Sequence, residues 1–368
     1  MNAARLLQFV ESLLAAEKEF SIQQKFNDLL SAMNNLASQP QQAQFQTDVA
    51  AKLGELETVL LRLSNDLSPA ELALVSEIGG VNYFTTTASN SVRDLIAKNA
   101  MTPAVVQQGI QSLTSKRQDY LNTLQKLRDG MKSVGIAPLT IEYGEAEIGF
   151  LIPRPLFENN LDGLWKELKV IDRILSIFSE SVSGRPETAV VRQISSSDPT
   201  FFFGLGVATI VVIGKTITWL LDTYKKGLEI KDLHHRAHKA GLPADALAPF
   251  EEHIKKSIDR AIETRISEIL GPKEIATARG RELENGLRWA MNSLIARIER
   301  GMTVEIRFLP PPQPEEGETT TTDAETTDAF KDLDQITSRL EFPPLQGSPI
   351  ISLPAAPPEN GDSKLPKQ

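Results

Sequence analysis

Hydrophobic residues recur every three or four positions through the first part of the chain. This spacing places the apolar side chains of a segment on one face of an α-helix, where they pack against a neighbouring helix. Three segments carry it most clearly, at 22–36, 45–67 and 106–134. In the third, the pattern lasts about four heptads and is interrupted only by Arg117, which is typical of a coiled coil. The pattern predicts a helical bundle with a coiled-coil region over residues 1–136.

Helix boundary signals in this region agree with the periodicity. The segment SPAE at 68–71 has the form of a capping box with proline at the first helical position, and Gly135 stands where a helix C-terminus is expected. The stretch 79–90 is rich in Gly, Thr, Asn and Ser and is interpreted as a loop. Because the seam at 106–134 is long, we expect the bundle to self-associate, with an internal hairpin against 45–67 as the alternative.

A period of two replaces the helical period after Pro138. Alternating apolar side chains predict strands at 145–152 and 189–195, with an amphipathic helix between them. Strand, helix and strand in this order form a βαβ unit with two parallel strands. A third strand at 303–309, in which apolar and charged residues alternate, is expected to join the sheet begun at residue 145. Glu147, on the first strand, is interpreted as part of an exposed face.

Further amphipathic helices at 247–269 and 283–298 complete the second region, since their apolar residues again recur at helical spacing. A chain of 368 residues, 41% of them hydrophobic, is long enough for two or three units with real cores. The fold class that we expect is α+β and predominantly helical. It comprises a helical bundle at 1–136, a small-sheet domain with helical cover at 138–309, and a tail at 310–368.

The most apolar window of the chain, FFFGLGVATIVVIGKTITWLL at 201–221, is long enough to cross a bilayer. Lys215 lies inside it, and the basic residues after it would place its C-terminal side in the cytosol and export a long preceding segment without a signal. We therefore interpret the window as a buried element that covers the sheet, with a membrane span as the alternative. Its Gly214-Lys215-Thr216 lacks the first glycine of a P-loop, where Thr209 stands, so we expect no nucleotide cofactor.

All four histidines of the chain lie between residues 234 and 253. His234 and His238 are four residues apart on one predicted helix, a spacing that can chelate a metal ion. A turn at 241–245 would bring Glu251 opposite His234 and leave His253 about one helical turn away, which gives a site of two histidines and a carboxylate. The neighbouring Lys and Arg residues favour a solvated basic face instead, because they repel a divalent ion.

The composition changes at Pro310. Residues 310–368 hold half of the 22 prolines and carry eleven acidic and four basic residues, a net of −7 out of −9 for the whole chain. Such a segment buries too little apolar surface to offset its chain entropy, so it is predicted to be disordered. Within it, the segment 328–342 has a narrow apolar stripe of Phe330, Leu333, Ile336 and Leu340. Because so short a helix is unstable alone in water, we expect it to fold by docking, on the helical bundle or on a partner.

Composition also narrows the classes of function. The chain has no cysteine, which removes disulfides and thiolate chemistry and fits a reducing cytosol. Its negative charge disfavours nucleic-acid binding. We expect a non-catalytic, cytoplasmic interaction or scaffold protein that acts through helical surfaces, with a protein partner or a second copy and without a cofactor. The alternatives are a protein anchored in an inner or plasma membrane by a single span at 201–221, and a metal-dependent hydrolase that uses His234, His238, Glu251 and His253.

Overall fold

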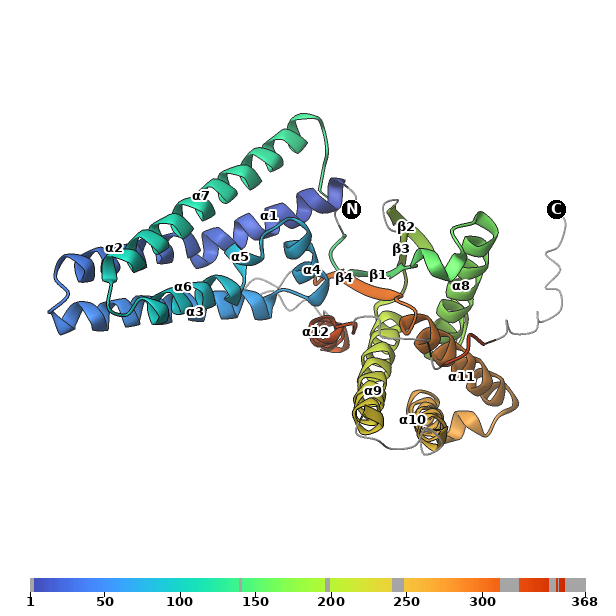
Figure 1. Cartoon of the computed structure of the whole chain (residues 1–368). Coiled ribbons are helices and arrows are strands. Elements are labelled where there is room, and N and C mark those ends of the chain that lie inside the picture. The colour runs from blue at the N-terminus through green and yellow to red at the C-terminus, as the bar shows by residue number, and fades with distance from the viewer. Residues whose placement is uncertain are drawn as a thin grey trace. The chain divides into compact units, whose positions relative to one another are not determined.

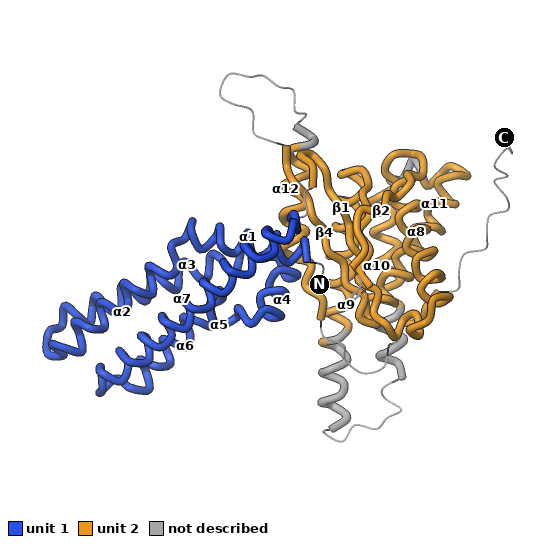
Figure 2. Tube along the Cα trace, turned by 90° about the horizontal axis from the view of Figure 1, so that it is seen from above, with its two compact units in different colours: residues 1–140 blue, residues 141–368 orange. Residues whose placement is uncertain are grey.

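A computed structural model of the chain describes residues 3–138, 141–195, 199–239, 248–311, 324–343, 349 and 351–354. They form two compact units, Met1–Thr140 and Ile141–Gln368 (Figure 1 and Figure 2). Each unit has a hydrophobic core of its own. In the described part of the chain, the first unit consists of helices and the second combines helices with a four-stranded antiparallel sheet. The predicted fold class, a predominantly helical α+β protein, is confirmed.

The first unit is a bundle of helices whose apolar faces meet in one core. The bounds of its helices are α1 (Ala3–Phe20), α2 (Ile22–Ser38), α3 (Ala43–Asp66), α4 (Pro69–Glu77), α5 (Val81–Phe84), α6 (Thr86–Lys98) and α7 (Pro103–Ser133). Helix α2 packs against both α3 and α7, and α6 packs against the same two helices. The periodicity of the sequence therefore predicts the helical character of this unit correctly.

Local sequence signals set several helix ends in the bundle. The predicted capping box at the start of α4 is confirmed, since the Ser68 hydroxyl accepts a hydrogen bond from the Glu71 amide at 3.3 Å and the Glu71 carboxylate accepts one from the Ser68 amide at 2.9 Å. Gly135 follows α7 with a φ of 81°. The Ile136 amide donates to the Met131 carbonyl, which closes the end of α7 in a Schellman motif.

The loop predicted at 79–90 is wrong. This stretch holds the short helix α5 and the first turns of α6, which begins at Thr86. The side chain of Thr85 caps α6 by accepting a hydrogen bond from the Thr87 amide at 3.2 Å. Threonine is common both in turns and at helix N-termini, so the cluster that resembles a loop in the sequence initiates a helix in the structure.

Arg117, which interrupts the apolar pattern of α7, is fully buried in the core of the bundle. Its guanidinium donates to the Tyr83 carbonyl at 3.1 Å and to the side-chain oxygen of Gln23 at 2.9 Å, and it forms an ion pair with Glu17. Two phenylalanine rings lie 5.3 and 5.4 Å from it. A buried charge is tolerated when it is paired in this way. Arg117 therefore ties α7 to α1, α2 and α5.

The predicted seam of α7 is largely filled inside the first unit. The helix packs against α1, α2 and α6, and the residues buried along the seam include Val106, Ile110 and Leu124. Helix α3, the alternative hairpin partner, packs mainly against α2 and α6. Near the C-terminal end of α7, Leu127 and Val134 are exposed. Self-association of this unit stays a prediction.

The second unit is built on an antiparallel sheet with the strand order β2-β3-β1-β4. Its strands are β1 (Glu145–Leu151), β2 (Val190–Ser195), β3 (Thr200–Gly204) and β4 (Thr303–Leu309). Strand β4 pairs with the whole of β1, from Glu145 opposite Leu309 to Leu151 opposite Thr303. The prediction that the last strand joins the sheet begun at residue 145 is confirmed.

The predicted βαβ unit is wrong in its strand pairing. Strands β1 and β2 run in the same direction and are connected through the short 3-10 helix η1 (Arg154–Phe157) and helix α8 (Leu161–Ser183). Strand β3, however, lies between them and pairs antiparallel with both, so the unit is split. The cause is the segment FFFG at 201–204, which forms a strand of its own and which sequence periodicity merges with the helix that follows.

Four helices of the second unit share a core with the inner face of the sheet, and among them α9 (Val207–Lys239) packs directly on β1 (Figure 1). The others are α10 (Ala248–Ile275) and α11 (Ala278–Ile298), together with α8. Two rows of apolar side chains cross this face. One row is Ile306–Ile148–Phe203–Val191 and the other is Val304–Phe150–Phe201–Ile194. The two β1 residues at the middle of the rows are fully buried in the core shared with the helices.

The apolar window at 201–221 divides into β3 and the first part of α9. Within the described residues, the stretch Val207–Gly227 of α9 is the one helix long and apolar enough to cross a membrane. Of this window, 61% is buried inside the protein. Ile210, Ile213 and Ile217 are fully buried in the core of the second unit. Most of the window therefore packs against the fold itself.

The short helix expected within the tail 310–368 is present in the structure. Ala324–Arg339 form helix α12, which overlaps the predicted docking helix at 328–342. It packs on α9 and β4 of the second unit, a different docking site from the two expected from the sequence. Residues 312–323 and 355–368 of the same predicted tail lie outside the described residues.

Candidate interaction surface

Helix α12 buries one face in the second unit and exposes the other. The apolar stripe predicted for it is confirmed, because Phe330, Leu333, Ile336 and Leu340 are all buried in the core of that unit. The side chains of Lys331 and Asp334 between them are exposed. We call the surface that α12 covers the α12 groove, and we define it by Gly214, Lys215, Asp222 and Lys225 of α9 with Ile306 and Phe308 of β4.

Gly214 lets α12 approach α9 closely. A Cβ atom at this position would lie 2.8 Å from Cγ2 of Ile336 and 2.9 Å from Cδ1 of Ile306. Both distances are shorter than the separation of about 3.5 Å at which carbon atoms make contact. Gly214 is therefore a notch in α9 into which Ile336 fits. The glycine that resembles part of a P-loop in the sequence has this packing role in the structure.

The β4 side of the α12 groove is aromatic. The rings of Phe308 and Phe330 lie with their centroids 6.0 Å apart and their planes inclined by 43°. Aromatic pairs at such distances contribute about 0.5–1.5 kcal/mol beyond the burial of their surface. Strand β4 is an edge strand of the sheet, so α12 supplies apolar cover at that edge.

Three ion pairs connect α9 to the tail at the rim of the α12 groove. They join Lys215 to Asp332 at 2.6 Å, Asp222 to Arg339 at 2.6 Å, and Lys225 to Glu341 at 2.8 Å. The signs run positive, negative, positive along α9 and negative, positive, negative along the tail. All three pairs are partly exposed, so each contributes only about 0.2–1 kcal/mol and weakens with added salt. Their main effect is to fix how α12 is placed along α9.

The residues proposed for a metal site fall on two helices. His234 and His238 lie within the bounds of α9, and Glu251 and His253 lie within those of α10. Their side chains lie outside the described residues. Among the side chains that the structure describes, no group of three His, Cys, Asp or Glu residues could hold a metal ion. The histidine site stays a prediction from the sequence.

A buried ion pair, which the sequence does not indicate, connects α8 to α11. Both oxygens of the Glu167 carboxylate accept hydrogen bonds from the Arg297 guanidinium, at 2.6 and 3.1 Å. Arg297 also donates to the Ser293 carbonyl at 3.1 Å. The paired geometry satisfies both charges within the core, where either one alone would be costly. The pair therefore holds two core helices together, and sequence reasoning misses it because its partners are 130 residues apart.

The outer face of the sheet carries a second polar cluster. The Arg307 guanidinium lies 3.8 Å from the centre of the Phe202 ring and donates to Glu147 at 3.3 Å and to the side-chain oxygen of Gln193 at 3.2 Å. Burial raises the pKa of the Glu147 carboxyl, and the charge of Arg307 offsets part of that rise. The interpretation of Glu147 as an exposed residue is wrong, because its neighbours on the adjacent strands cover it.

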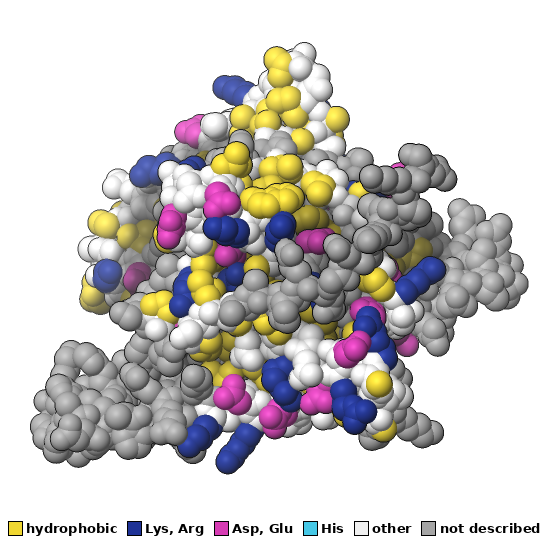
Figure 3. Space-filling model, turned by 90° about the vertical axis from the view of Figure 1, so that its right-hand side faces the viewer, with side chains coloured by type: hydrophobic (Ala, Val, Ile, Leu, Met, Phe, Trp, Pro, Cys, Tyr) yellow, Lys and Arg dark blue, Asp and Glu magenta, His cyan; other side chains and the backbone are white. Residues whose placement is uncertain are grey.

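Strand β2 forms the opposite edge of the sheet, and its apolar side chains are exposed. Val190, Val191 and Ile194 all reach the solvent. A bulge between Val191 and Gln193 places Val191 and Ile194 on the same face of the strand, opposite Phe203 and Phe201. Figure 3 shows one side of the molecule on which hydrophobic side chains lie at the surface between charged ones.

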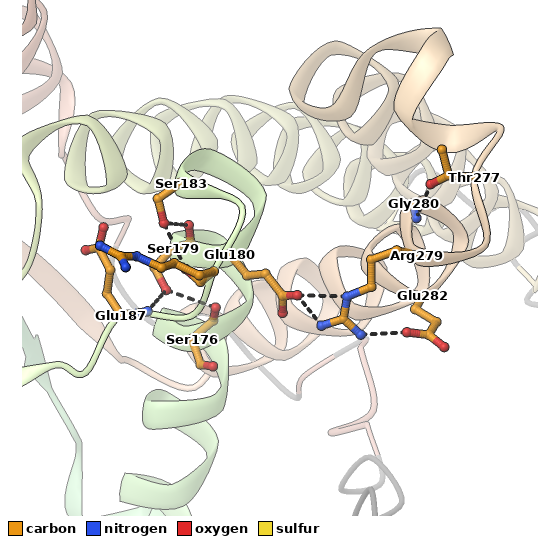
Figure 4. A network of polar contacts seen from close by, with 10 residues as sticks. Ser176, Ser179, Glu180, Ser183, Glu187, Thr277, Arg279, Gly280 and Glu282 are labelled. Carbon is orange, nitrogen blue, oxygen red and sulfur yellow. Dashed lines mark hydrogen bonds and ion pairs between the residues drawn. The ribbon is translucent and has the colours of Figure 1, made fainter.

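A network of hydrogen bonds fixes the turn that leads into β2 (Figure 4). The Ser179 hydroxyl accepts a hydrogen bond from the Glu187 amide at 2.9 Å, and the Glu187 carboxylate accepts one from the Gly206 amide at 3.2 Å. The adjacent Glu180 forms an ion pair with Arg279 of α11. The C-terminal end of α8 is therefore tied both to the start of β2 and to α11.

No family model, curated protein or solved structure matches the chain. Support for a function therefore comes from this chain's own residues. Among the surfaces described above, the α12 groove is the one on which the structure places an amphipathic helix from a distant part of the sequence.

Proposed function

We propose that this chain is a non-catalytic interaction protein whose α12 groove binds an amphipathic helix. In this proposal α12 is the resident occupant, and a helix of a partner replaces it. The observation that carries the proposal is the way α12 is held, by a stripe of four apolar side chains over a glycine notch and by three ion pairs at the rim. Grooves that recognise helical peptides use the same combination of spaced apolar anchors and polar rim contacts.

The position of α12 in the chain supports the proposal that a partner helix can replace it in the groove. Fourteen residues, 310–323, separate the end of β4 from the start of α12. They include four prolines and no Leu, Ile, Val, Phe or Met, so they offer no large apolar side chain that could anchor α12 to the sheet. Helix α12 has 16 residues, and helices of this length are marginal in water by themselves. Its helical structure therefore depends on the α12 groove.

A tethered occupant competes strongly with a free ligand. A segment joined to its binding site within one chain is held at an effective concentration on the order of millimolar. A free helix with the contacts of α12 alone would therefore displace little of it at micromolar concentration. A partner must either make further contacts or meet a chain in which α12 is weakened, and the second case can be built by substitution.

The test uses the full-length chain with Ile336→Asp, which places a carboxylate against the notch at Gly214. The matched control is Gln335→Asp, which adds the same charge one position earlier on the exposed side of α12. A fluorescent peptide of residues 323–343 is titrated into each protein. We expect saturable binding to the Ile336→Asp variant with a Kd of roughly micromolar, and little binding to the wild type or to the control.

Two further measurements make the outcome decisive. Circular dichroism and thermal unfolding establish that the Ile336→Asp variant is folded. A second peptide carries Ile336→Asp itself and should not bind. The proposal is contradicted if the folded variant fails to bind the peptide, or if both peptides bind it equally well.

A further inference from the structure

The tail contacts the second unit at a second place beyond α12. The backbone amide of Ile351 donates a hydrogen bond to the Glu299 carboxylate at 2.8 Å, and the Ile351 side chain packs against the core of the unit. Resting on the proposed function, we propose that this place is a second subsite for the same partner, which carries an amphipathic helix followed by a non-helical apolar segment. We call it the Glu299 subsite and define it by Glu299 and Tyr224.

Glu299 is placed where a carboxylate needs hydrogen-bond donors. It is the residue that directly follows α11, at the C-terminal cap of the helix, and it is only 7% exposed. The end of a helix carries partial negative charge on its last carbonyls, which disfavours a second negative charge there. Burial adds a further cost unless donors compensate for the lost water. An N–H group brought by another segment of chain lowers both costs, so the position favours recognition of a backbone donor.

The Glu299 subsite lies close to one end of the α12 groove. Tyr224 stands between the rim residues Asp222 and Lys225 in the sequence of α9, and its side chain is buried in the core of the second unit. Burial, together with the nearby negative charge of Glu299, raises the pKa of Tyr224 to about 12. The carboxylate is therefore near the stretch of α9 at which Lys225 pairs with Glu341. A ligand that leaves the groove at this end reaches the subsite next.

The hydrogen bond at Glu299 selects a segment that is not helical. Beyond the first turn of a helix, each amide already donates to the carbonyl four residues earlier. Residues 351–354 lie outside the helices and strands, and Pro354 prevents a helix from continuing through them. Ile351 follows Leu340, the last apolar anchor of the α12 stripe, by eleven residues. The matching partner therefore has an apolar residue other than proline at about this distance beyond its helix.

The two subsites divide the recognition between them. The α12 groove distinguishes sequences, because it requires a particular spacing of apolar and charged side chains. A backbone amide is common to every residue except proline, so the Glu299 subsite adds affinity with little further demand on sequence. The helix alone is then only part of the ligand.

The experiment uses the full-length Ile336→Asp/Ile351→Asp protein, in which both docking contacts of the tail are disrupted. Fluorescent peptides of residues 323–343 and 323–354 are titrated into it after circular dichroism has shown that it is folded. We expect the longer peptide to bind about tenfold more tightly, because it adds a hydrogen bond to a charged group and a partly buried isoleucine.

Two matched changes identify the contact at Glu299 as the source of the gain. N-methylation of the Ile351 amide in the longer peptide removes the donor, keeps the side chain and should abolish the gain. N-methylation of the Leu353 amide, whose side chain is 41% exposed, should preserve it. Glu299→Ala in the protein should abolish the gain and leave the binding of the shorter peptide unchanged, which shows that the α12 groove is intact.

The inference is wrong if the two peptides bind equally well, or if N-methylation at Ile351 and at Leu353 has the same effect. In both cases the shorter peptide still reports on the α12 groove, so a failure of the Glu299 subsite is distinguishable from a failure of the proposed function. If neither peptide binds the folded protein, the proposed function and the subsite are both contradicted.

Discussion

The two apolar rows of the sheet in the second unit run from edge strand β4 to edge strand β2. The side chains at their two ends differ in how much they are exposed to solvent. At the β4 edge, Val304 and Ile306 are 4% and 3% exposed. At the β2 edge, Val191 and Ile194 are 54% and 58% exposed. The strands are similar in length and in apolar content. One element that packs on β4 is the tail helix α12.

The comparison shows two ways to protect an edge strand. Strand β4 is covered by a helix from elsewhere in the chain. Strand β2 instead has a bulge, and Arg192 reaches across Gly204 to form an ion pair with Glu145 of β1 at 2.9 Å. Bulges and charged side chains both hinder pairing with another strand. The proposed function assigns the covered edge as the one at which a partner helix replaces α12.

The largest expected difference between the edges is in the free energy of unfolding. Leu333 is fully buried under α12, so we expect Leu333→Ala to lower this free energy by about 2–4 kcal/mol. Ile194→Ala removes the same kind of side chain from the uncovered edge and should change it by only about 0.5 kcal/mol. Urea unfolding of the two variants and the wild type measures both. Equal losses would mean that the two edges do not differ in the way the exposures indicate.

Two glycine-to-alanine substitutions are expected to change the stability of the protein in opposite directions. Gly214→Ala gains about 1 kcal/mol of helix propensity but forces a methyl group against Ile336 and Ile306, which costs about 1–3 kcal/mol. We expect a net loss of about 1 kcal/mol in stability and weaker docking of α12. Gly54→Ala in α3, where nothing lies within 4 Å of the new Cβ, should stabilise by about 0.5–1 kcal/mol. Thermal unfolding of both variants gives the two signs, and a gain at Gly214 would contradict the notch.

The ion pairs at the two edges should have similar, small coupling energies, but only one of them should affect peptide binding. Double-mutant cycles on Lys215–Asp332 and on Arg192–Glu145 should each give a coupling of about 0.2–1 kcal/mol that decreases in 1 M salt. Only the first pair should affect binding of the 323–343 peptide. We expect Lys215→Glu to weaken α12 docking and Lys215→Glu/Asp332→Lys to restore it. The same binding assay on Arg192→Glu should give the wild-type result.

The smallest expected effect concerns Glu147, which lies on the outer face between the two edges. Burial raises its pKa in the folded protein above the ordinary value of 4.5, so the folded state binds this proton more tightly than the unfolded state. The contribution of Glu147 to stability therefore falls as the pH rises from 4.5 through the folded pKa, and it is constant above that. Urea unfolding of Glu147→Gln and the wild type over this range should show the variant gaining relative stability with rising pH. An opposite slope would mean that Arg307 outweighs burial.

Sequence patterns predict the helix and the strand that form the α12 groove, but they do not predict how these elements pack together. The stripe of α12 and the alternation of β4 are both local, so periodicity alone finds Phe330, Leu333, Ile306 and their neighbours. The contact of Gly214 with Ile336 joins residues far apart in the chain, and no local pattern encodes it. From its neighbours in the sequence alone, Gly214 resembles part of an incomplete P-loop.

The errors of the sequence analysis have a common cause. The sequence pattern does not separate β3 from α9 because both are apolar, and it predicts a loop at 79–90 because threonine is frequent in turns and at helix caps alike. Glu147 resembles an exposed strand residue in the sequence because its partner Arg307 is 160 residues away, and that partner offsets the cost of burying the Glu147 charge. Periodicity reports which face of an element is buried, whereas pairing order and buried charges depend on contacts across the fold.

Hydrogen exchange of the full-length protein tests most directly whether α12 can leave its groove without unfolding of the unit. Exchange is followed by mass spectrometry in the wild type, Ile336→Asp and Gln335→Asp. We expect Ile336→Asp to abolish protection over residues 327–340 while β1 and β4 keep theirs, and Gln335→Asp to resemble the wild type. Loss of protection in β1 together with α12, or unchanged protection of α12, would show that α12 does not leave the groove independently.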